Sequence, residues 1–528
     1  MQTPDEHPRQ RTLRHAAYGV LATVVGLAAA HLVAALTVPA ASPVLAVGST
    51  VIDLTPTPLK EWAIAQFGSN DKPILIGSVL LGVLALAAVA GLLALRRWAY
   101  GAVLLVALVA LAAGAALTRP TAGLLDVVPS LAAAVAGVGA LWWLDRLHRR
   151  ARPAADLAPG TAGSTGSTAT PGSPGASRRG VLVATAALTA AAAMMGGAGR
   201  WITAYRTRPA SVDLPAAADA APKLPVGLDD RVPGITPFRT PSEEFYRVDT
   251  RLTLPVVDLD GWSLTIDGDV DQEVTFTFDD LLAMKLIERD ITLTCVSNDV
   301  GGRYVGSARW LGVPLTDLLD RAGVANTRAD QILSTDVDGM TIGTPFDLAT
   351  DGRDAMIAIG MNGEALPREH GFPARMVVPG LYGFISATKW ITRITLTTYA
   401  EQDAYWTQRK WATDAPIKVS SRIDTPKPLS TIDAGRTVIG GVAWAQHQGG
   451  LEKVEVRIDG GGWQAARLGP SGGQDYWRQW YLPWTAEPGQ HSLAVRAVTG
   501  EDETQTAARA TPFPNGSSGI QEVVVTVS

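Results

Sequence analysis

The sequence predicts a multidomain protein: all-α transmembrane helices at the N-terminus, an α+β domain in the middle, and an all-β sandwich at the C-terminus. Three patterns indicate this order. Long uncharged apolar runs fill the first 200 residues, short alternating strands mix with short helices in the middle, and helical patterns disappear after residue 415. The predicted parts are 1–150 (four transmembrane helices), 151–177 (linker), 178–200 (a fifth helix), 205–414 (the α+β domain) and 415–528 (the sandwich).

Five apolar runs are each near the length of about 20 residues that crosses a bilayer. They are Ala16–Val38, Pro73–Leu95, Trp98–Leu117, Ala122–Leu144 and Gly180–Gly199. Inside lipid every backbone polar group must be satisfied within the protein, so these runs are predicted to be helices. The alternative, core helices of a soluble protein, is disfavoured by their length and lack of charge.

Arginine clusters predict the orientation of these helices. The clusters are Arg9, Arg11 and Arg14; Arg96 and Arg97; Arg146, Arg149, Arg150 and Arg152; and Arg178 and Arg179. All of them lie on one side of the membrane if the N-terminus is cytoplasmic, as the positive-inside rule favours. We therefore expect a multi-pass protein of the plasma membrane in which everything after Arg200 is extracytoplasmic.

Residues 151–177 are rich in Ala, Gly, Ser, Thr and Pro, which is typical of a flexible linker. The pair Arg178-Arg179 before an apolar run resembles a twin-arginine export signal. Simple positive-inside bias is the alternative. Ala198-Gly199-Arg200 offers no convincing cleavage site, so whether the fifth helix is retained stays open.

Composition excludes several classes of protein. A net charge of −5 without a basic stretch disfavours nucleic-acid binding. Cys295 is the only cysteine, which excludes intrachain disulfides, Cys-rich zinc sites and iron–sulfur clusters. His31 is the only histidine within the predicted spans and no CxxCH occurs, so we expect no haem. Acids are scarce in the spans, which disfavours a transporter. The helices are a plain anchor or a dock for an electron partner: a quinone, a cytochrome or a membrane protein.

Cys295 lies where a predicted strand meets a polar turn. Ile291, Leu293 and Cys295 alternate with threonines, and Ser297, Asn298 and two glycines then read as a loop. A thiol at such a position suits a reactive thiolate or a metal ligand. Because free cysteines are among the most buried residues, an inert core cysteine is the alternative. Further along, residues 361–390 are dense in Gly, Pro, His, Arg, Ser and Lys, which suits an anion-binding loop system.

The order of motifs from about residue 243 to 410 resembles the sulfite oxidase family of molybdenum-cofactor enzymes. The motifs are a strand ending in Cys295, Asn298, GSARW-GVPL, MNG, HGFPAR, VVPG-YG and TKW. Gly441–Trp444, Val454–Gly461, Trp463 and Pro514–Gly519 resemble the immunoglobulin-like C-terminal domain of that family. The resemblance implies a homodimer formed through residues 415–528; a purely structural packing role is the alternative.

The resemblance also implies roles for particular residues. Cys295 would give the thiolate ligand of molybdenum, and Tyr405 would be a catalytic hydrogen-bond donor on the substrate side. The implied contacts of the molybdenum–molybdopterin cofactor are Asp249, Thr250, Cys295, Ser297, Asn298, His370, Arg375, Ser386, Thr388 and Lys389.

The chain departs from the family pattern at two positions where sulfite oxidases have anion-binding arginines. Val300 stands five residues after Cys295, and Val248 follows the FY motif. A pocket without these cations binds a dianion poorly, so an S-oxide or N-oxide reduced by oxygen-atom transfer competes with sulfite as the substrate. Arg303 or Arg309 would compensate in part. A non-catalytic membrane-anchored binding or scaffold protein that reuses the fold is the alternative function.

Overall fold

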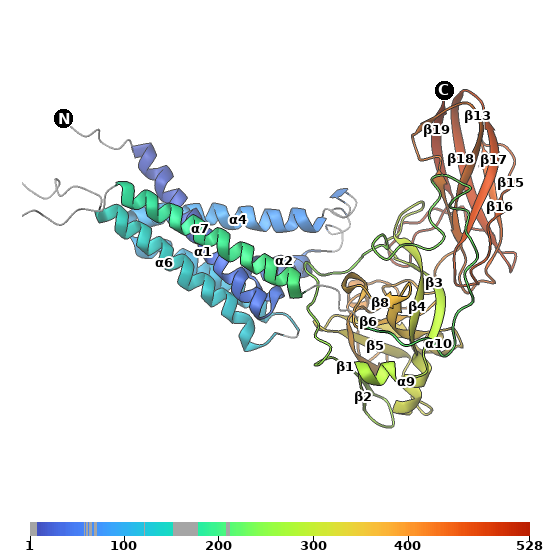
Figure 1. Ribbon diagram of the computed structural model, residues 1–528, viewed down its shortest axis with the longest axis horizontal. Helices are drawn as coiled ribbons and strands as arrows, with labels where there is room; N and C mark the ends of the chain where they lie inside the picture. The colour runs from blue at the N-terminus through green and yellow to red at the C-terminus, as the bar shows by residue number, and fades with distance from the viewer. Residues whose placement is uncertain are drawn as a thin grey trace, which may run out of the picture. The chain divides into compact units, whose positions relative to one another are not determined.

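The computed structural model describes residues 8–56, 71–120, 122–150, 178–206 and 212–528, with positions 59, 62, 66 and 67. The chain divides into two compact units (Figure 1). The helical unit comprises Met1–Arg208 with Arg251–Val256, and the β-rich unit comprises Pro209–Thr250 with Val257–Ser528. The predicted linker, residues 151–177, lies outside the described residues.

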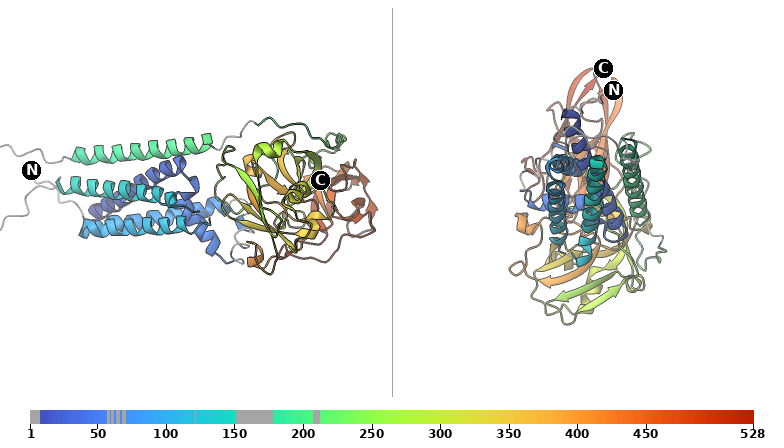
Figure 2. Two further views of the ribbon diagram at one scale, coloured as in Figure 1. Left: turned by 90° about the horizontal axis from the view of Figure 1, so that it is seen from below. Right: turned by 90° about the vertical axis from the view of Figure 1, so that its left-hand side faces the viewer.

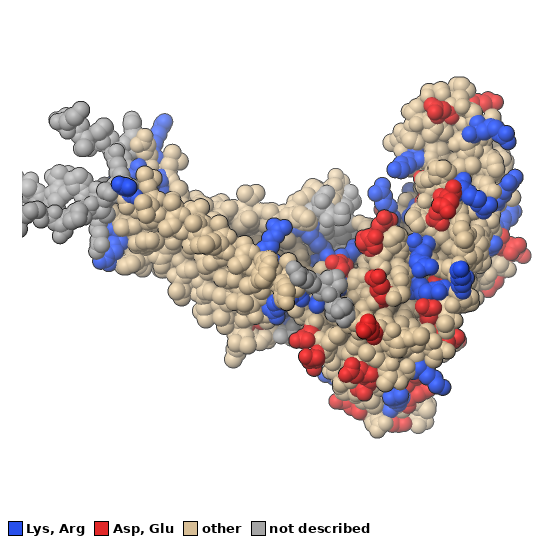
Figure 3. All heavy atoms as spheres, in the orientation of Figure 1, with Lys and Arg blue, Asp and Glu red and all other residues tan. Residues whose placement is uncertain are grey.

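Five long helices form the helical unit and lie alongside one another (Figure 2). They are α1 (Pro8–Leu36), α4 (Asp71–Arg96), α5 (Trp98–Leu117), α6 (Val128–Arg150) and α7 (Arg178–Arg206). By length and apolar composition each is able to cross a membrane, in agreement with the five predicted runs. Charged side chains are absent from most of the length of this unit on the face shown in Figure 3.

Two details of this unit differ from the prediction. The fourth run begins as a 3-10 helix, η3 (Leu124–Val127), before α6 starts. The segment after α1, predicted as a loop, contains the helix α2 (Pro43–Leu54), which has proline at its first position. An apolar helix of 12 residues is too short to be detected as a membrane span, so hydropathy alone did not reveal it.

Helix α1 packs against α4, α6 and α7. Small residues make this close packing possible. A Cβ atom on Gly19 would lie 2.0 Å from the Ala87 carbonyl oxygen of α4, and one on Gly26 would lie 2.8 Å from the Ala133 carbonyl oxygen of α6. Glycines at helix contacts let the backbones approach, which favours association where lipid removes the hydrophobic driving force.

The middle region mixes two sheets with short helices, as predicted. One sheet has the order β3 (Ile287–Thr294), β4 (Val305–Pro314), β7 (Met356–Met361) and β8 (Glu364–Ala365), and β9 (Arg375–Val377) also pairs with β7. The other has the order β2 (Val274–Thr277), β1 (Ser263–Gly268), β10 (Ile391–Thr397), β5 (Gln331–Asp336) and β6 (Thr341–Pro345). The helical segments are α8 (Phe278–Leu282), α9 (Leu315–Ala322), α10 (Phe346–Thr350), η5 (Arg368–His370) and η6 (Thr407–Arg409).

Two boundaries in this region differ from the local sequence pattern, which predicts a helix that opens at Trp310–Leu315 and an N-cap at Asp279 and Asp280. Residues 310–314 were expected to open a helix, but they form the end of β4, and α9 begins at Leu315. The cap of α8 was expected at Asp279 and Asp280 but is Thr277. Thr277 Oγ1 accepts a hydrogen bond from the Asp280 N–H at 3.2 Å, and the Asp280 carboxylate accepts one from the Thr277 N–H at 2.8 Å. This capping box satisfies two helix-end donors.

The C-terminal region is built from two sheets around one apolar core, in keeping with the predicted all-β region. The first has the order β11 (Ser420–Thr425), β13 (Gly435–Trp444), β17 (Arg478–Ala486) and β16 (Arg467–Leu468). The second has the order β12 (Thr431–Ile432), β19 (Gln521–Val527), β18 (Gly489–Thr499), β14 (Leu451–Ile458) and β15 (Gln464–Ala465). Trp480, Val456 and Val525 are fully buried in the core.

The middle and C-terminal sheets share buried hydrogen bonds at one strand. The Thr292 hydroxyl of β3 accepts a hydrogen bond from the Trp477 backbone N–H at 2.7 Å. The Thr292 carbonyl oxygen accepts one from Gln446 Nε2 at 3.0 Å. Trp477 also donates its indole N–H to the Phe238 carbonyl oxygen at 2.8 Å. Phe238 lies in residues 212–240, which form neither helix nor regular strand, as expected for an extended lead-in. Strand β3, which leads to Cys295, is therefore fixed from the C-terminal side.

Candidate cofactor-binding site

Cys295 directly follows β3 and is 8% exposed. Its N–H donates to the Tyr304 carbonyl oxygen at 2.9 Å, and its own carbonyl oxygen accepts from the Asn298 N–H at 3.0 Å. Burial raises the pKa of the thiol, whereas hydrogen bonds from Ser297 and the nearby Lys389 ammonium lower it. A thiol beside hydrogen-bond donors and a cation can be stabilised as a thiolate, which an apolar core cysteine cannot.

The residues from 295 to 303, the Cys295 loop, are held from within and from the C-terminal sheets. Asn298 Oδ1 accepts from the Tyr304 N–H at 2.8 Å. The Ser517 hydroxyl donates to the Asn298 carbonyl oxygen, and Arg422 Nη1 donates to the Gly302 carbonyl oxygen at 2.8 Å. The predicted cofactor contact Asn298 thus has its amide oxygen engaged inside the loop. The Cys295 loop is rigidified by residues that lie far away in the sequence.

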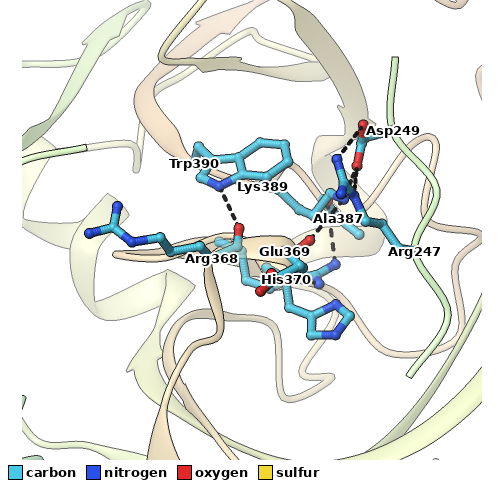
Figure 4. A network of polar contacts seen from close by, with 9 residues as sticks. Arg247, Asp249, Arg368, Glu369, His370, Ala387, Lys389 and Trp390 are labelled. Atoms are coloured by element: carbon cyan, nitrogen blue, oxygen red, sulfur yellow. Dashed lines mark hydrogen bonds and ion pairs between the residues drawn. The ribbon is translucent and has the colours of Figure 1, made fainter. Parts of the chain in front are cut away.

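A second group of side chains forms a basic cluster: His370, Arg375 and Lys389. Figure 4 labels His370 and Lys389 of this cluster. Arg375 of β9 is 5% exposed, donates to the His370 carbonyl oxygen at 3.1 Å, and lies with its guanidinium carbon 5.0 Å from the Trp310 ring centre. Lys389 Nζ donates to the Glu369 carbonyl oxygen at 3.2 Å and pairs with the Asp249 carboxylate at 3.0 Å. The structure therefore brings four of the predicted cofactor contacts together: Asp249, His370, Arg375 and Lys389.

Local backbone geometry lets these cations approach one another. Gly371 adopts φ +116°, and a Cβ atom there would lie 3.0 Å from the Arg375 Cβ and 3.2 Å from the Lys389 Cα. Positive φ and this crowding both favour glycine. The Trp390 indole donates to the Arg368 carbonyl oxygen at 2.8 Å, which fastens the turn after Lys389 to η5. The HGFPAR and TKW motifs meet through this pairing.

Burial makes the basic cluster electrostatically costly. Desolvation lowers the pKa of Lys389 to about 8, although the Asp249 carboxylate opposes this, and lowers the pKa of Arg375 to about 10. Burial and the Arg375 charge lower the pKa of His370 to about 4, so this imidazole is neutral at pH 7. Asp249 is shared between Lys389 and Arg247, whose Nε lies 2.7 Å from the carboxylate. The cluster therefore has an excess of buried positive charge, which an anion would stabilise.

Other predicted contacts have their hydroxyls engaged with the protein. The Ser386 hydroxyl donates to the Leu381 and Tyr382 carbonyl oxygens at 3.1 and 3.0 Å, and the Thr388 hydroxyl pairs with that of Ser334. Both side chains are fully buried and hold the turn that presents Lys389. Thr250 is half-buried next to Asp249. For Ser386, Thr388 and Thr250, contact with a cofactor stays a prediction.

Tyr405, the predicted catalytic tyrosine, lies beneath a cation. The guanidinium carbon of Arg409 lies 3.5 Å from the centre of its ring, and Arg409 Nη1 donates to the Tyr405 carbonyl oxygen at 2.9 Å. Both side chains are half-buried. A catalytic role for Tyr405 stays a prediction, and the sequence analysis did not single out Arg409.

Two tyrosines that received no role from the sequence, the half-buried Tyr246 and the buried Tyr382, lie close enough to Cys295 to interact with its charge. Burial raises the pKa of Tyr246 above its ordinary value, and the Cys295 thiolate adds to this shift. Burial likewise raises the pKa of Tyr382 to about 12; the Lys418 backbone N–H donates to its hydroxyl and opposes the shift. Both residues lie in motifs that the sequence already displayed, FY and VVPG-YG, but neither pattern predicted a role for the phenol.

Comparisons with known proteins agree with this geometry. Residues 251–406 match the oxidoreductase molybdopterin binding domain. The chain is 30% identical over 315 residues to mitochondrial sulfite oxidase of Homo sapiens, covering 50% of this chain and 56% of that protein. It is 26% identical to sulfite oxidase of Arabidopsis thaliana, covering 46% of this chain and 73% of that protein. The chain has a sulfite oxidase family molybdopterin domain.

The chain spans about half the length of the animal sulfite oxidases that it matches. Among solved structures, the sulfane dehydrogenase SoxCD of Paracoccus pantotrophus aligns with a TM-score of 0.48 and 24% identity, covering 60% of this chain and 96% of that one.

The donor set fits a molybdopterin cofactor. Within the described parts of the chain, no group of three or more His, Cys, Asp or Glu side chains lies in position to hold a metal ion. A metal with Cys295 as its protein ligand must therefore bring most of its other ligands, which a dithiolene pterin does. The basic cluster supplies cations for the phosphate of the pterin.

The basic cluster predicts a pH dependence of stability in the cofactor-free protein. The pKa of Lys389 is about 8 in the folded state against an ordinary 10.5, so between about pH 8 and 10 the unfolded chain binds more protons. We expect the free energy of unfolding to rise with pH across this window. Lys389→Met should reduce the rise and stabilise the cofactor-free protein at pH 7 by about 1–3 kcal/mol. Thermal unfolding at pH 7 to 10 measures both effects.

The matched control for this prediction is Lys427→Met, because Lys427 is exposed. Its pH profile should overlay that of the wild type. Identical profiles for the wild type and Lys389→Met would contradict the assignment of buried charge to Lys389.

Proposed function

We propose that this chain is a membrane-anchored molybdenum-cofactor oxidoreductase that transfers an oxygen atom, with two electrons, to or from a small sulfur or nitrogen oxide or oxyanion. The observation that supports this most directly is the buried basic cluster next to the buried thiol of Cys295. A cluster that retains uncompensated cations and a thiol that a cation stabilises are complementary to one ligand, an anionic pterin that carries a metal.

The residues divide into two roles in this proposal. Cys295 supplies the thiolate to the metal, and Arg375 and Lys389 bind the phosphate. Neutral His370 is oriented by the contact of its Nε2 with the Ser242 carbonyl oxygen, at 2.9 Å. Lys389 contributes to both: its charge attracts the phosphate, and it also lowers the pKa of the Cys295 thiol. When bound, the molybdenum cofactor supplies the two-electron chemistry of oxygen-atom transfer.

The arginines near the Cys295 loop are either engaged with the protein or exposed, which favours an uncharged oxide over sulfite as the substrate. Arg309, one expected compensating residue, is held by the Asp290 carboxylate through two contacts of 2.9 and 2.6 Å. This pair fixes Arg309 on β4, so we do not assign it to the substrate. Arg303 is exposed and Val300 is half-buried. Arg409, on the ring of Tyr405, is the remaining candidate for binding a polarised S–O or N–O group.

We further propose that the five long helices anchor the enzyme in the plasma membrane with the β-rich unit outside the cytoplasm. Their length and apolar composition support membrane insertion, and the arginine clusters support a cytoplasmic N-terminus. Electrons would then be exchanged with a quinone, a cytochrome or a membrane protein. Residues 415–528, the predicted immunoglobulin-like domain, would form the contact of a homodimer.

Cofactor loading tests the central proposal. Protein from cells that make the cofactor should contain about one molybdenum and one pterin per chain. Cys295→Ser should lower the turnover of the best substrate at least about 100-fold while leaving thermal unfolding nearly unchanged. Arg375→Gln should lower pterin content, measured by fluorescence after oxidation, because it removes a buried cation. Arg393→Gln, at an exposed arginine, is the control and should retain the pterin. Molybdenum-free wild-type protein from such cells would refute the proposal.

Replacing the missing cation tests the substrate. With a dye as electron partner, methionine sulfoxide and related oxides should be turned over with a higher kcat/KM than sulfite. Val300→Arg should raise kcat/KM for sulfite by about tenfold, the equivalent of about 1.4 kcal/mol. Val226→Arg, in the exposed lead-in, adds the same charge elsewhere and should leave both values unchanged. If sulfite is already the better substrate of the wild type, the oxide assignment is wrong.

Fusing a reporter after Ser528 tests the orientation. A phosphatase that folds only outside the cytoplasm should be active there, because five spans and a cytoplasmic N-terminus place residue 528 on the outer side. The same reporter inserted after Arg97 should be inactive. Activity at Arg97 combined with inactivity at Ser528 would reverse the proposed topology.

A further inference from the structure

Outside the cofactor site, a cavity of about 750 Å³ opens where α4 ends, α5 begins and α6 ends. Four arginines line it: Arg96, Arg97, Arg146 and Arg149. These side chains are exposed, whereas Asp145, which also lines the cavity, is buried. The cavity therefore has a rim of cations around one deep carboxylate.

The charge balance of this cavity favours an anion. Asp145 Oδ2 accepts from Arg149 Nε at 2.7 Å, so the carboxylate and this arginine neutralise each other. Arg96, Arg97 and Arg146 carry the remaining charge of the lining. The guanidinium carbon of Arg146 lies 5.0 Å from the centre of the Trp142 ring, a cation–π contact that orients it at the cavity. An anion at this position would be attracted by about three charges.

The start of α5 contributes N–H donors to the cavity, although the C-terminal ends of α4 and α6 carry the opposite partial charge. The N-cap of α5 is Arg97, whose side chain makes no capping hydrogen bond, and the first two residues of the helix, Trp98 and Ala99, line the cavity. The first N–H groups of a helix have no partner within the helix, and the helix dipole gives this end of the 20-residue α5 a partial positive charge. Helix N-termini of this kind bind phosphate groups.

The surroundings of the cavity distinguish a lipid from a soluble anion. The helices that form it continue into exposed apolar side chains, among them Val89 of α4, Val103 of α5 and Val135 of α6. In sequence, Trp98 lies between Arg97 and Val103, and Trp142 lies between Val135 and Arg146. Tryptophan is enriched at such positions, where a helix passes from lipid to water. A free phosphate would use the arginines alone, whereas a phospholipid would use both surfaces.

We propose that this cavity binds the phosphodiester headgroup of an anionic phospholipid, with the acyl chains along α4, α5 and α6. The proposal rests on the membrane insertion proposed above. With a cytoplasmic N-terminus, the lipid would belong to the inner leaflet, whose anionic lipids attract basic segments of this kind.

Lipid titration of the full chain in a mild neutral detergent tests this site. The probes are phosphatidylglycerol, phosphatidylcholine with the same acyl chains, and inorganic phosphate, and native mass spectrometry counts the bound lipid. Phosphatidylglycerol should bind saturably and at least about tenfold more tightly than phosphatidylcholine, and phosphate should not displace it. Arg97→Gln/Arg146→Gln should weaken phosphatidylglycerol binding by about tenfold or more.

The control is Arg14→Gln/Arg200→Gln, which removes the same charge from two exposed arginines of the helical unit that do not line the cavity. It should bind phosphatidylglycerol like the wild type. Equal weakening in both double variants, or equal affinity for phosphatidylcholine, overturns the site. Displacement by phosphate at comparable affinity overturns the lipid assignment in favour of a soluble anion.

Membrane fractionation of the same variants separates this test from the proposed function. Protein that sediments with membranes and contains molybdenum but does not discriminate between the lipids refutes the lipid site alone. Protein that leaves the membrane fraction in high salt refutes the anchor on which the site depends.

Discussion

Buried positive charge is the constraint on which the cofactor site depends. Arg375 and Lys389 are buried against backbone carbonyls and the rings of Trp310 and Trp390, and only Lys389 pairs with a carboxylate, that of Asp249. This arrangement destabilises the cofactor-free chain. A buried cation loses more free energy through desolvation than its hydrogen bonds to neutral carbonyl oxygens provide. Binding of an anion at this position would offset that loss of stability. The side chains that lower the stability of the cofactor-free chain are therefore the ones expected to raise its affinity for the cofactor.

The same charge connects the two halves of the site. Lys389 lies between Ser386 and Trp390, whose hydrogen bonds fasten the chain on either side of it, and its ammonium lowers the pKa of the Cys295 thiol against the effect of burial. A substitution at the proposed phosphate-binding cluster would therefore change the pKa of the Cys295 thiol. Tyr246 responds to both ends, since its pKa is raised by Cys295 and lowered by Arg375. The site behaves electrostatically as one unit although its members come from three separate segments of the chain.

Local patterns predicted the elements that carry these residues but not the contacts between them. Hydropathy was enough for the five long helices, and strict alternation was enough for the strand before Cys295. Prediction failed where a boundary depends on tertiary pairing, as at Trp310, whose strand β4 is fixed by pairing with β3 and β7. Capping by Thr277 was visible in principle as a Thr-x-x-Asp pattern. The ion pair between Asp249 and Lys389 joins residues 140 positions apart, a proximity that motif order alone does not give.

The contacts of the Cys295 loop with the C-terminal sheets have a consequence for biosynthesis. Ser517 bonds to the loop across 219 residues of sequence, and Arg422 does so across 120. A ribosome therefore completes β3 and Cys295 long before the residues that rigidify the Cys295 loop have been made. During that interval the thiol is uncoordinated and its loop is unsupported. The support of the Cys295 loop is therefore complete only in a chain whose C-terminal sheets have been made and have folded.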